Sequence, residues 1–397
     1  MRLSLSMIVK NEEANLGRCL ASVQPYVDEM VIVDTGSSDN TKAIAEQYGA
    51  KVYDHPWQDD FATARNVALS HVSGDWVLVL DADETLTEAA GPALRDAIAQ
   101  PDYLVINLLR QEIGANDNPY SEVSRLFRRH PALRFSHPYH AQVDDSVIQL
   151  CQQETHWRIV TLPLIALQHT GYQPEMIAAK QKLVITQRIL EKYLKTNPQD
   201  SYSNNKLAAL YIQIGQVDRG IHLLEKTLQL PEISPSVLYE IYYHLGNGYW
   251  QRGDRPKAIA AYQQAITIQI LPPLQIGAYH NLGCLLLEQG EYGLARIAWE
   301  TVLQIDPDFA SGYYHLGLAL SKQQNYEAAI ACYQQTLRFE PENADAYRGL
   351  GVAYLQEAQL ESSKNAFRAA LALYEAQKSP QAHNLKKHLQ EIGFPID

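Results

Sequence analysis

The chain has 397 residues, 46% of them hydrophobic and 20% charged, a globular balance that excludes a disordered protein and suggests two or three domains. Its net charge of −12 argues against a general nucleic-acid-binding protein, which would carry a basic face. No apolar run reaches the ~20 residues of a membrane-spanning helix, and the N-terminus turns charged too early for a secretory signal. The four cysteines lie far apart, without the spacing of a disulfide framework or zinc ribbon. We therefore expect a cytoplasmic protein without a transmembrane segment, with a peripheral position at the inner membrane as the alternative.

The chain alternates β-rich runs with helical patterns up to about residue 115. The expected strands are residues 3–9, 30–34, 50–53, 76–81 and 103–109, and the expected helices are residues 12–23, 39–49, 60–72 and 87–99. Strands that alternate with helices predict an α/β domain whose mostly parallel sheet is covered by helices on both faces. From residue 115 to 170 the pattern is less regular and indicates further strands, whose order it does not give.

The second half of the chain is periodic. Leu-Gly pairs recur at 245/246, 282/283, 316/317 and 350/351, in steps of 37, 34 and 34 residues. A small residue follows each glycine after twelve positions and a large one after sixteen, as Ala295 and Trp299 follow Gly283. A weaker copy precedes them, with Ala208 in the place of the glycine.

This period and its small/large code resemble the tetratricopeptide repeat, which builds an all-α solenoid. We expect five copies over residues 201–376. A linker helix at residues 173–200 would precede them, and a capping helix and tail at residues 377–397 would follow. Residues 1–172 would then form the other domain.

Two carboxylates, Asp81 and Asp83, come directly after a buried strand, at the sheet edge where open α/β sheets bind ligands. With no basic residue beside them in sequence they would repel each other unless they shared a cation, and carboxylate oxygens suit Mg²⁺ or Mn²⁺. The alternative is that Asp83 and Thr87 cap the following helix. A second Asp-x-Asp motif, at Asp306 and Asp308, falls in a turn between repeats and is expected by chance.

Two further strand ends carry acidic residues that we expect at the same edge of the sheet. Asp34 ends the second strand and leads into a Gly-Ser-Ser turn, and Glu12 follows the first strand. The basic run at residues 125–134 could face a diphosphate, or it could be a solvated loop.

Four segments of this domain, VKNEEANLGRCLASV, IVDTGSSDNT, HPWQDDFATARN and GDWVLVLDADE, resemble in this order the family 2 glycosyltransferases. The resemblance covers residues 1 to about 172 and is strongest to bacterial members with C-terminal tetratricopeptide repeats. It implies the A-type glycosyltransferase fold, a nucleotide-sugar donor, most often a UDP-sugar, and a Mn²⁺ or Mg²⁺ cofactor. It also implies a donor site formed by Glu12, Asp34, Arg65, Asn66 and Asp81, and a metal site formed by Asp83, Asp81 and His169.

The catalytic base is where the sequence departs from the family. Residues 137–145 resemble a segment in which a His is followed by Glu, but Ala141 stands in the place of that Glu. Asp144, Asp145 and His140 are the nearest replacements for a base that takes the proton of the acceptor hydroxyl.

The resemblance implies an inverting transferase of the hexosyltransferase type that acts on a protein or glycan acceptor. The departure at Ala141 leaves a second hypothesis, a transferase-like scaffold without turnover that serves as a protein-interaction module. A third, a nucleotidyltransferase on a similar sheet, would normally carry a Gly- and Arg-rich phosphate loop, which VKNEE is not.

The repeats would recruit a protein partner or the acceptor through an extended concave face. Counting each glycine as the eighth repeat position, the resemblance places the fifth position in the groove, where it carries Tyr243, His280, Tyr314 and Arg348. Tyrosines give amphipathic contact area suited to peptides or sugars. Sixteen of the 24 tyrosines lie beyond residue 200, so the tyrosine excess belongs to the repeats.

Overall fold

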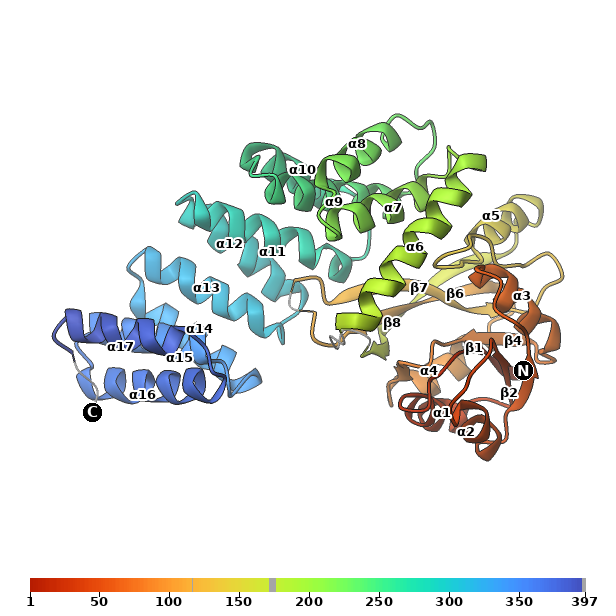
Figure 1. The fold of residues 1–397 in the computed structure, drawn as a ribbon, viewed down its shortest axis with the longest axis horizontal. Coiled ribbons are helices and arrows are strands. Elements are labelled where there is room, and N and C mark those ends of the chain that lie inside the picture. The colour runs from red at the N-terminus through yellow and green to blue at the C-terminus, as the bar shows by residue number, and fades with distance from the viewer. Residues whose placement is uncertain (116, 171–175, 395–397) are drawn as a thin grey trace. The chain divides into compact units, whose positions relative to one another are not determined.

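The computed structural model describes residues 1–115, 117–170 and 176–394 (Figure 1). The chain divides into two compact units, Met1–Ile233 and Ser234–Asp397. Among the described residues, no helix is both long and apolar enough to cross a membrane.

The described residues of the first unit form one sheet of eight strands in the order β3-β2-β1-β4-β7-β6-β8-β5. The strands are β1 (Leu3–Val9), β2 (Glu29–Asp34), β3 (Lys51–Asp54), β4 (Trp76–Val79), β5 (Glu84–Leu86), β6 (Tyr103–Glu112), β7 (Tyr120–Arg128) and β8 (Arg158–His169). The run β3-β2-β1-β4 is parallel, as the alternation of strands and helices predicts. The sheet as a whole is mixed, because β7 pairs antiparallel with both β4 and β6, and β5 pairs antiparallel with β8.

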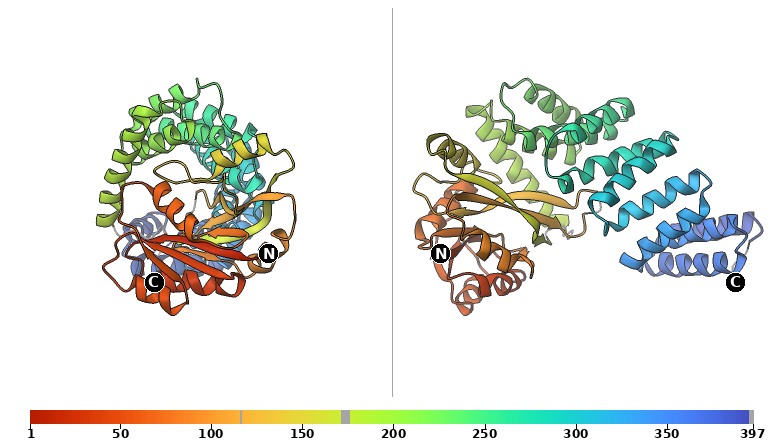
Figure 2. Two further views of the ribbon diagram at one scale, coloured as in Figure 1. Left: turned by 90° about the vertical axis from the view of Figure 1, so that its right-hand side faces the viewer. Right: turned by 180° about the vertical axis from the view of Figure 1, so that it is seen from behind.

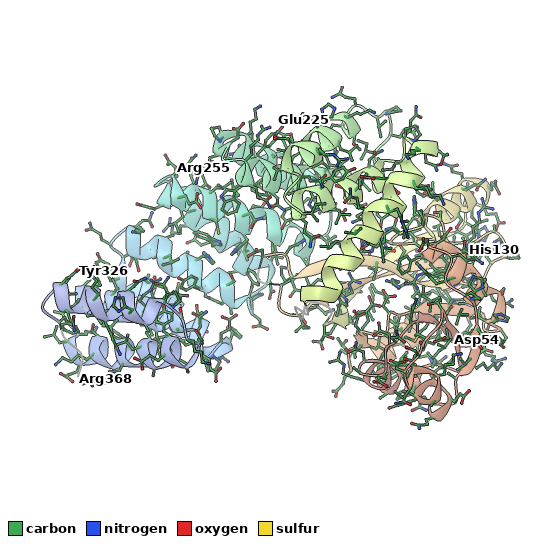
Figure 3. All side chains as sticks on the ribbon, in the orientation of Figure 1. Asp54, His130, Glu225, Arg255, Tyr326 and Arg368 are labelled. Carbon is green, nitrogen blue, oxygen red and sulfur yellow. The ribbon has the colours of Figure 1, made fainter. Side chains whose placement is uncertain are left out.

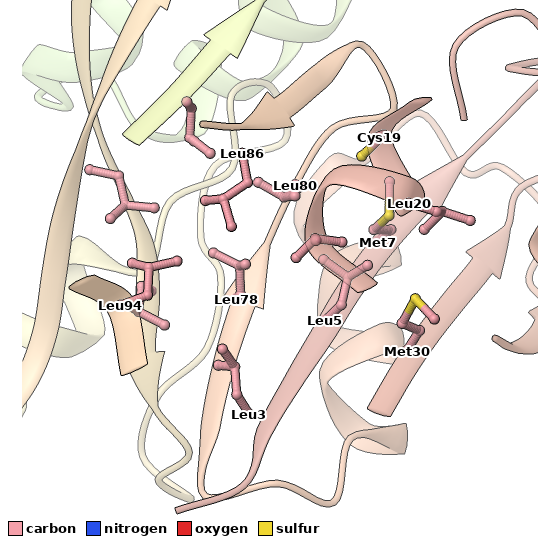
Figure 4. Close-up of a cluster of buried hydrophobic side chains, with 14 of the residues drawn as sticks. Leu3, Leu5, Met7, Cys19, Leu20, Met30, Leu78, Leu80, Leu86 and Leu94 are labelled. Atoms are coloured by element: carbon pink, nitrogen blue, oxygen red, sulfur yellow. The ribbon is translucent and has the colours of Figure 1, made fainter. Parts of the chain in front are cut away.

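Helices lie on both faces of this sheet (Figure 2). The helices of the first unit are α1 (Leu16–Val23), the 3₁₀ helix η1 (Gln24–Tyr26), α2 (Thr41–Gln47), α3 (Phe61–His71), α4 (Ala90–Ala97), α5 (Asp144–Gln153), α6 (Met176–Thr196), α7 (Ser201–Gln213) and α8 (Val217–Thr227). The first core, drawn in Figure 4, packs α1, α2 and α4 against one face through residues such as Leu5, Leu20 and Leu78. The second core packs α3 and α5 against the other face, through residues such as Val77 and Phe127.

The central strands are buried along almost their whole length because both faces of the sheet are covered. In β1 and β4 all but one residue are buried, and every residue of β2 is buried. Such continuous runs are typical of parallel strands between two helical layers. The edge strand β3 is the contrast, since Asp54 at its end is exposed (Figure 3).

The second unit consists of helices that pair with their neighbours in sequence. They are α9 (Pro235–Gln251), α10 (Arg255–Thr267), α11 (Pro272–Glu288), α12 (Tyr292–Ile305), α13 (Ala310–Lys322), α14 (Tyr326–Phe339), α15 (Ala344–Gln356), α16 (Leu360–Ala376) and α17 (Gln381–Glu391). The pairs α9/α10, α11/α12, α13/α14 and α15/α16 each hold one copy of the Leu-Gly motif in the first helix.

The repeating glycines and aromatic residues explain this pairing. A Cβ atom at Gly283 would lie 2.7 Å from Trp299 Cε2, and one at Gly246 would lie 2.5 Å from Tyr262 Cε1. Only a glycine in the first helix of each pair leaves room for the aromatic ring of the second helix to pack this closely. The rings of Tyr262 and Trp299 are fully buried, so the small/large code of the sequence is a packing code.

Candidate active site

The loops that follow β1 and β2 are joined into one rim. Asn11, in the left-handed conformation at φ +55°, accepts a hydrogen bond on Oδ1 from the Ser38 N–H at 2.8 Å. The Glu12 N–H donates to Thr41 Oγ1 at 2.7 Å, while Asn15 Nδ2 donates to Glu12 Oε2 at 3.0 Å. These bonds hold Glu12 beside the turn that follows β2.

Asp34, at the end of β2, is buried and half-satisfied. Its Oδ2 accepts from the backbone N–H groups of Gly36 and Ser37, each at 2.9 Å. Its Oδ1 is buried and has no hydrogen-bond partner among the described residues. Although burial opposes the charge, hydrogen bonds from Ser37 and Gly36 lower the pKa of Asp34. The side chain is thus a charged acceptor with one oxygen left for a donor group of a ligand.

Asp81 lies just beyond β4, between two arginines. Arg65 Nη2, from α3, donates to Asp81 Oδ1 at 2.6 Å, and Arg125 Nη2, from β7, donates to Oδ2 at 2.7 Å. Burial opposes the charge of Asp81, but the two guanidinium groups hold its pKa well below the usual range. In each arginine Nη1 is buried and has no partner among the described residues. The cluster therefore keeps two guanidinium donors for an anion.

Asp83 contacts His169, whereas Asp81 contacts the two arginines. His169 Nε2 lies 3.1 Å from Asp83 Oδ2, and its Nδ1 lies 2.5 Å from Glu112 Oε2. Burial lowers the pKa of His169, but the two carboxylates outweigh it and raise the pKa to about 9. Glu112 has a pKa of about 2, because its bonds to His169 and Arg110 outweigh the effect of burial. The raised pKa favours the protonated form of His169, which can donate to both carboxylates.

A divalent cation fits the Asp83 and His169 pair by the chemistry of its donors. A carboxylate oxygen and an imidazole nitrogen whose other nitrogen is held by Glu112 form an oriented ligand pair. The Asp83 and His169 side chains are 31% and 19% exposed, so a ligand can reach them. Asp81 does not share this contact, because both of its oxygens accept from arginines.

Two members of this site, Glu112 and Arg125, are not among the residues that the sequence singles out individually. Glu112 ends β6, three residues beyond the strand expected at 103–109, and a strand-end acid is the signal that could have found it. Arg125 begins the basic run at residues 125–134. The sequence allows two interpretations of this run, one in which it faces a diphosphate and one in which it is a solvated loop. The structure places Arg125 in β7, with its side chain 14% exposed against Asp81.

The helix-capping explanation of Asp83 and Thr87 is wrong. Asp83 is followed by the short strand β5, which the sequence does not predict, and α4 begins only at Ala90. Thr87 Oγ1 donates to the Ile165 carbonyl at 2.9 Å, and the N-cap residue of α4, Ala89, makes no side-chain cap. The chain after Asp83 is therefore bound to β8, the strand that carries His169.

A β-bulge in β7 positions a second acidic residue. Relative to β6, β7 holds one extra residue, between Val123 and Leu126. Both of these flanking residues pack into the first core, so Ser124 and Arg125 share the opposite face of the sheet. The bulge thereby aims two consecutive polar side chains at the same side.

Asp144, at the start of α5, meets this bulge. Ser124 Oγ donates to Asp144 Oδ1 at 2.8 Å, while the adjacent Arg125 binds Asp81. Asp144 Oδ2 is buried and has no partner among the described residues. Burial raises the pKa of Asp144, against the hydrogen bond from Ser124. Asp144 is thus bound to the residue next to Arg125 in sequence, and one of its carboxylate oxygens is left without a partner among the described residues.

The other two candidates for the base have different surroundings. Asp145 Oδ2 lies 3.1 Å from His137 Nε2 and accepts from Ser136 Oγ at 2.6 Å. His137 is buried, with its Nδ1 3.0 Å from Oδ2 of Asp200, the N-cap residue of α7. His140 is exposed, and its backbone carbonyl accepts from Tyr202 Oη at 3.3 Å.

Two residues near these candidates serve the fold of the loop. Asn66 Nδ2 donates to the Phe135 carbonyl at 3.0 Å and its Oδ1 accepts from the Phe135 N–H at 2.8 Å, so its amide is occupied. Ala141 packs its methyl group against the second core. The segment from Phe135 to Asp145 is thus fixed by α3 and by the sheet.

The residues at the predicted groove position differ in exposure. Tyr243 and His280 are buried, whereas Tyr314 and Arg348 are half-buried. Arg348 Nη2 lies 3.0 Å from Asp345 Oδ1. Burial, together with the neighbouring imidazole of His315, lowers the pKa of His280 to about 3, so its imidazole is neutral. Two of the four positions therefore pack inside the repeats.

Comparison with known proteins agrees with both units. Residues 4–159 match the family described as glycosyl transferase family 2, and residues 239–269, 283–324 and 319–357 match tetratricopeptide repeat families. The TPR repeat-containing protein Synpcc7942_0270 of Synechococcus elongatus is 42% identical over 395 residues, covering 100% of this chain and 98% of that protein. An uncharacterized glycosyltransferase of Rickettsia felis is 31% identical over 188 residues, covering 45% of this chain and 66% of the relative.

Solved structures of repeat proteins also overlap with the chain. The crystal structure of YrrB, described as a TPR protein with an unusual peptide-binding site, covers 51% of this chain and 97% of its own, with 18% identity and a TM-score of 0.43. The family assignment rests on the sequence matches. The chain belongs to the proteins that join a family 2 glycosyltransferase domain to C-terminal tetratricopeptide repeats.

Proposed function

We propose that the protein is a metal-dependent transferase that moves a sugar from a nucleotide-sugar donor, most simply a UDP-sugar, to a protein or glycan acceptor. The observation that carries the proposal is the pair of neighbouring clusters after β4: Asp83 with His169, and Asp81 with Arg65 and Arg125. One offers cation ligands and the other offers guanidinium donors, which together suit a diphosphate.

The donor would lie along the rim formed by the loops after β1, β2 and β4. Glu12 and Asp34 would accept hydrogen bonds from the nucleoside, and the available Oδ1 of Asp34 supports this role. Arg65 and Arg125 would donate from Nη1 to the diphosphate. Asn66, whose amide is occupied by Phe135, would position the loop rather than touch the donor.

Mn²⁺ or Mg²⁺ would be held by Asp83 and His169, with Asp81 able to join them if its arginines turn to the diphosphate. Such a cation supplies charge neutralisation on the departing diphosphate. Glu112 would orient His169 through Nδ1, and Arg110 would fix Glu112 from behind through the bond between Arg110 Nε and Glu112 Oε1, at 2.8 Å.

Asp144 is the base that the geometry favours over Asp145 and His140. Its Oδ2 has no partner among the described residues, and Ser124, which binds its Oδ1, precedes Arg125 of the Asp81 cluster in β7. A raised pKa makes a carboxylate a stronger base for the proton of an acceptor hydroxyl. A transfer in which Asp144 acts as the base and no covalent intermediate forms inverts the configuration of the sugar, which is the outcome that we propose.

Donor binding can be tested by thermal unfolding with a panel of nucleotide sugars and Mn²⁺. A ligand at ~100 times its dissociation constant adds about 2.7 kcal/mol to the free energy of unfolding. We expect a shift for one UDP-sugar that needs the cation and is lost in Asp83→Asn. Asp308→Asn, in the second Asp-x-Asp motif of the chain, is the matched control and should keep it. No shift with any nucleotide sugar, with or without cation, would refute the proposal.

A second candidate is a transferase-like scaffold that binds the donor without turnover, and Ala141 is the observation that favours it. Its methyl group packs against the second core, so no carboxylate stands at the position where the family carries Glu. Asp144→Asn separates the two candidates, because it should abolish turnover in a transferase and change nothing in an inert scaffold.

All four cysteines are free thiols, which supports a reducing, cytoplasmic location for the protein under either candidate function.

The repeats, for which we propose residues 201–376, would bring a protein partner or the acceptor to the transferase domain. Tyr314 and Arg348 are the half-buried groove residues that can still contact a partner. Binding of a partner through this face should weaken in a Tyr314→Ala variant while metal-dependent donor binding stays unchanged.

A further inference from the structure

A cluster of metal-ligating side chains lies within the repeats of the second unit. His280 and Cys284 stand one turn apart on α11, and His315 comes from α13, the first helix of the next pair. One ligand atom from each of the three residues lies within 4.8 Å of the others. The cluster therefore lies between the first helices of two consecutive repeats, α11 and α13.

The distance between the first two ligands matches tetrahedral zinc. His280 Nε2 lies 3.7 Å from Cys284 Sγ. With Zn–S at about 2.3 Å and Zn–N at about 2.0–2.1 Å, a tetrahedral angle separates the two ligand atoms by about 3.6 Å. Two imidazoles and a thiolate are also the borderline and soft ligands that zinc prefers over magnesium or manganese.

The rings are held by their surroundings. The Nδ1–H of His315 donates to the Ser311 carbonyl at 2.8 Å, a tautomer that leaves Nε2 with the lone pair that a metal requires. The His315 ring also stacks on Trp299 at a centroid distance of 5.3 Å. His280 is buried, with its ring perpendicular to that of His315 at 4.7 Å and to that of Phe309 at 5.9 Å. To bind zinc, ligand atoms that now lie within 4.8 Å of one another would have to approach to about 3.3–3.6 Å.

We propose that His280, Cys284 and His315 bind one Zn²⁺ ion that joins α11 to α13. Cys284 and His315 are only half-buried, so water reaches the fourth coordination position. On binding, the Cys284 thiol gives its proton to solvent and coordinates as the thiolate. The ion would fix one repeat against the next and so set the curvature of the surface that holds Tyr314 and Arg348. The inference is independent of the proposed transferase activity.

The test is a titration of the full-length, metal-free protein with Co²⁺ as a spectroscopic substitute, followed by displacement with Zn²⁺. A thiolate ligand gives a sulfur-to-cobalt charge-transfer band that carboxylates cannot give. We expect the band in the wild type and in Cys332→Ser, a matched control at another half-buried cysteine. Cys284→Ser should lose the band, and His315→Gln should weaken Co²⁺ and Zn²⁺ binding by at least about tenfold.

Asp83→Asn separates this site from the transferase site, because it should keep the thiolate band. Zn²⁺ should also raise the unfolding temperature of the wild type but not that of Cys284→Ser, and circular dichroism would verify that this variant is helical. A wild type without the band, or a band that survives in Cys284→Ser, would overturn the proposal.

Discussion

The two carboxylates of the Asp81-Ala82-Asp83 motif should differ sharply in what they contribute to stability. Asp81→Asn replaces an anion between Arg65 and Arg125, whose side chains are 7% and 14% exposed. The amide oxygen of the new side chain can accept from one guanidinium, but its NH₂ group then faces the other. The variant therefore leaves a nearly buried arginine without its counter-charge.

The magnitude follows from these contacts. A hydrogen bond to a charged group contributes about 1.5–3 kcal/mol to stability. The Asp81 side chain is itself 36% exposed, so water screens part of the interaction and the two bonds do not add fully. We expect Asp81→Asn to lower the free energy of unfolding by about 2–3 kcal/mol. Asp83→Asn changes a single, partly exposed contact with His169, and we expect it to cost less than about 1 kcal/mol.

Urea unfolding followed by fluorescence and far-UV circular dichroism measures both variants against the wild type. A double variant, Asp81→Asn with Arg125→Met, should recover part of the loss, because it removes the arginine left without a partner. Equal destabilisation by Asp81→Asn and Asp83→Asn would refute the assignment of Asp81 to the arginines. So would a double variant that is less stable than the sum of its parts.

Three further predictions concern other contacts in the two units. Burial opposes the protonation of His137, but its two carboxylate partners raise its pKa from 6.5 to about 9. Up to about 3 kcal/mol of stability should therefore be present below pH 6.5 and be lost as the pH rises to 9. His137→Gln should flatten this part of the pH profile of unfolding. Gly283→Ala should destabilise the repeats by about 1–2 kcal/mol in urea, while Gly293→Ala, whose nearest neighbouring atom would be 3.8 Å away, should be neutral or stabilising. Glu112→Gln should raise the Mn²⁺ concentration for half-maximal donor turnover about 10–100-fold, since His169 loses its orienting partner, and an unchanged metal dependence would contradict that role.

Much of the fold could be predicted because its signals are local. The strands β1, β2 and β4 are short apolar runs, and each ends at a polar loop, so the edge that carries Asp34 and Asp81 follows from the alternation of strands and helices. The repeat helices could be predicted because the glycine and its large partner are fixed by packing. Gly283 meets Trp299, sixteen residues later, and the equivalent glycine and aromatic residue make the same contact in the pairs α9/α10, α13/α14 and α15/α16.

The rest of the site depends on pairings between distant segments, which no local pattern encodes. β5 exists because it pairs with β8, so that Glu84 stands opposite His169 across 85 positions of the chain. Arg125 reaches Asp81 because a bulge re-aims β7, and a bulge leaves no trace in the spacing of apolar residues. The sequence therefore predicts the antiparallel half of the sheet only as irregular, and it does not predict that Arg65 and Arg125 both bind Asp81.

The most direct test of the central claim, that this edge of the sheet activates a nucleotide sugar, is the release of free nucleotide from a UDP-sugar in the absence of acceptor. We predict slow, Mn²⁺-dependent release by the wild type and by Asp308→Asn, and none above background by Asp83→Asn. A wild type that releases no nucleotide from any sugar donor, or release that Asp83→Asn leaves unchanged, would contradict the account.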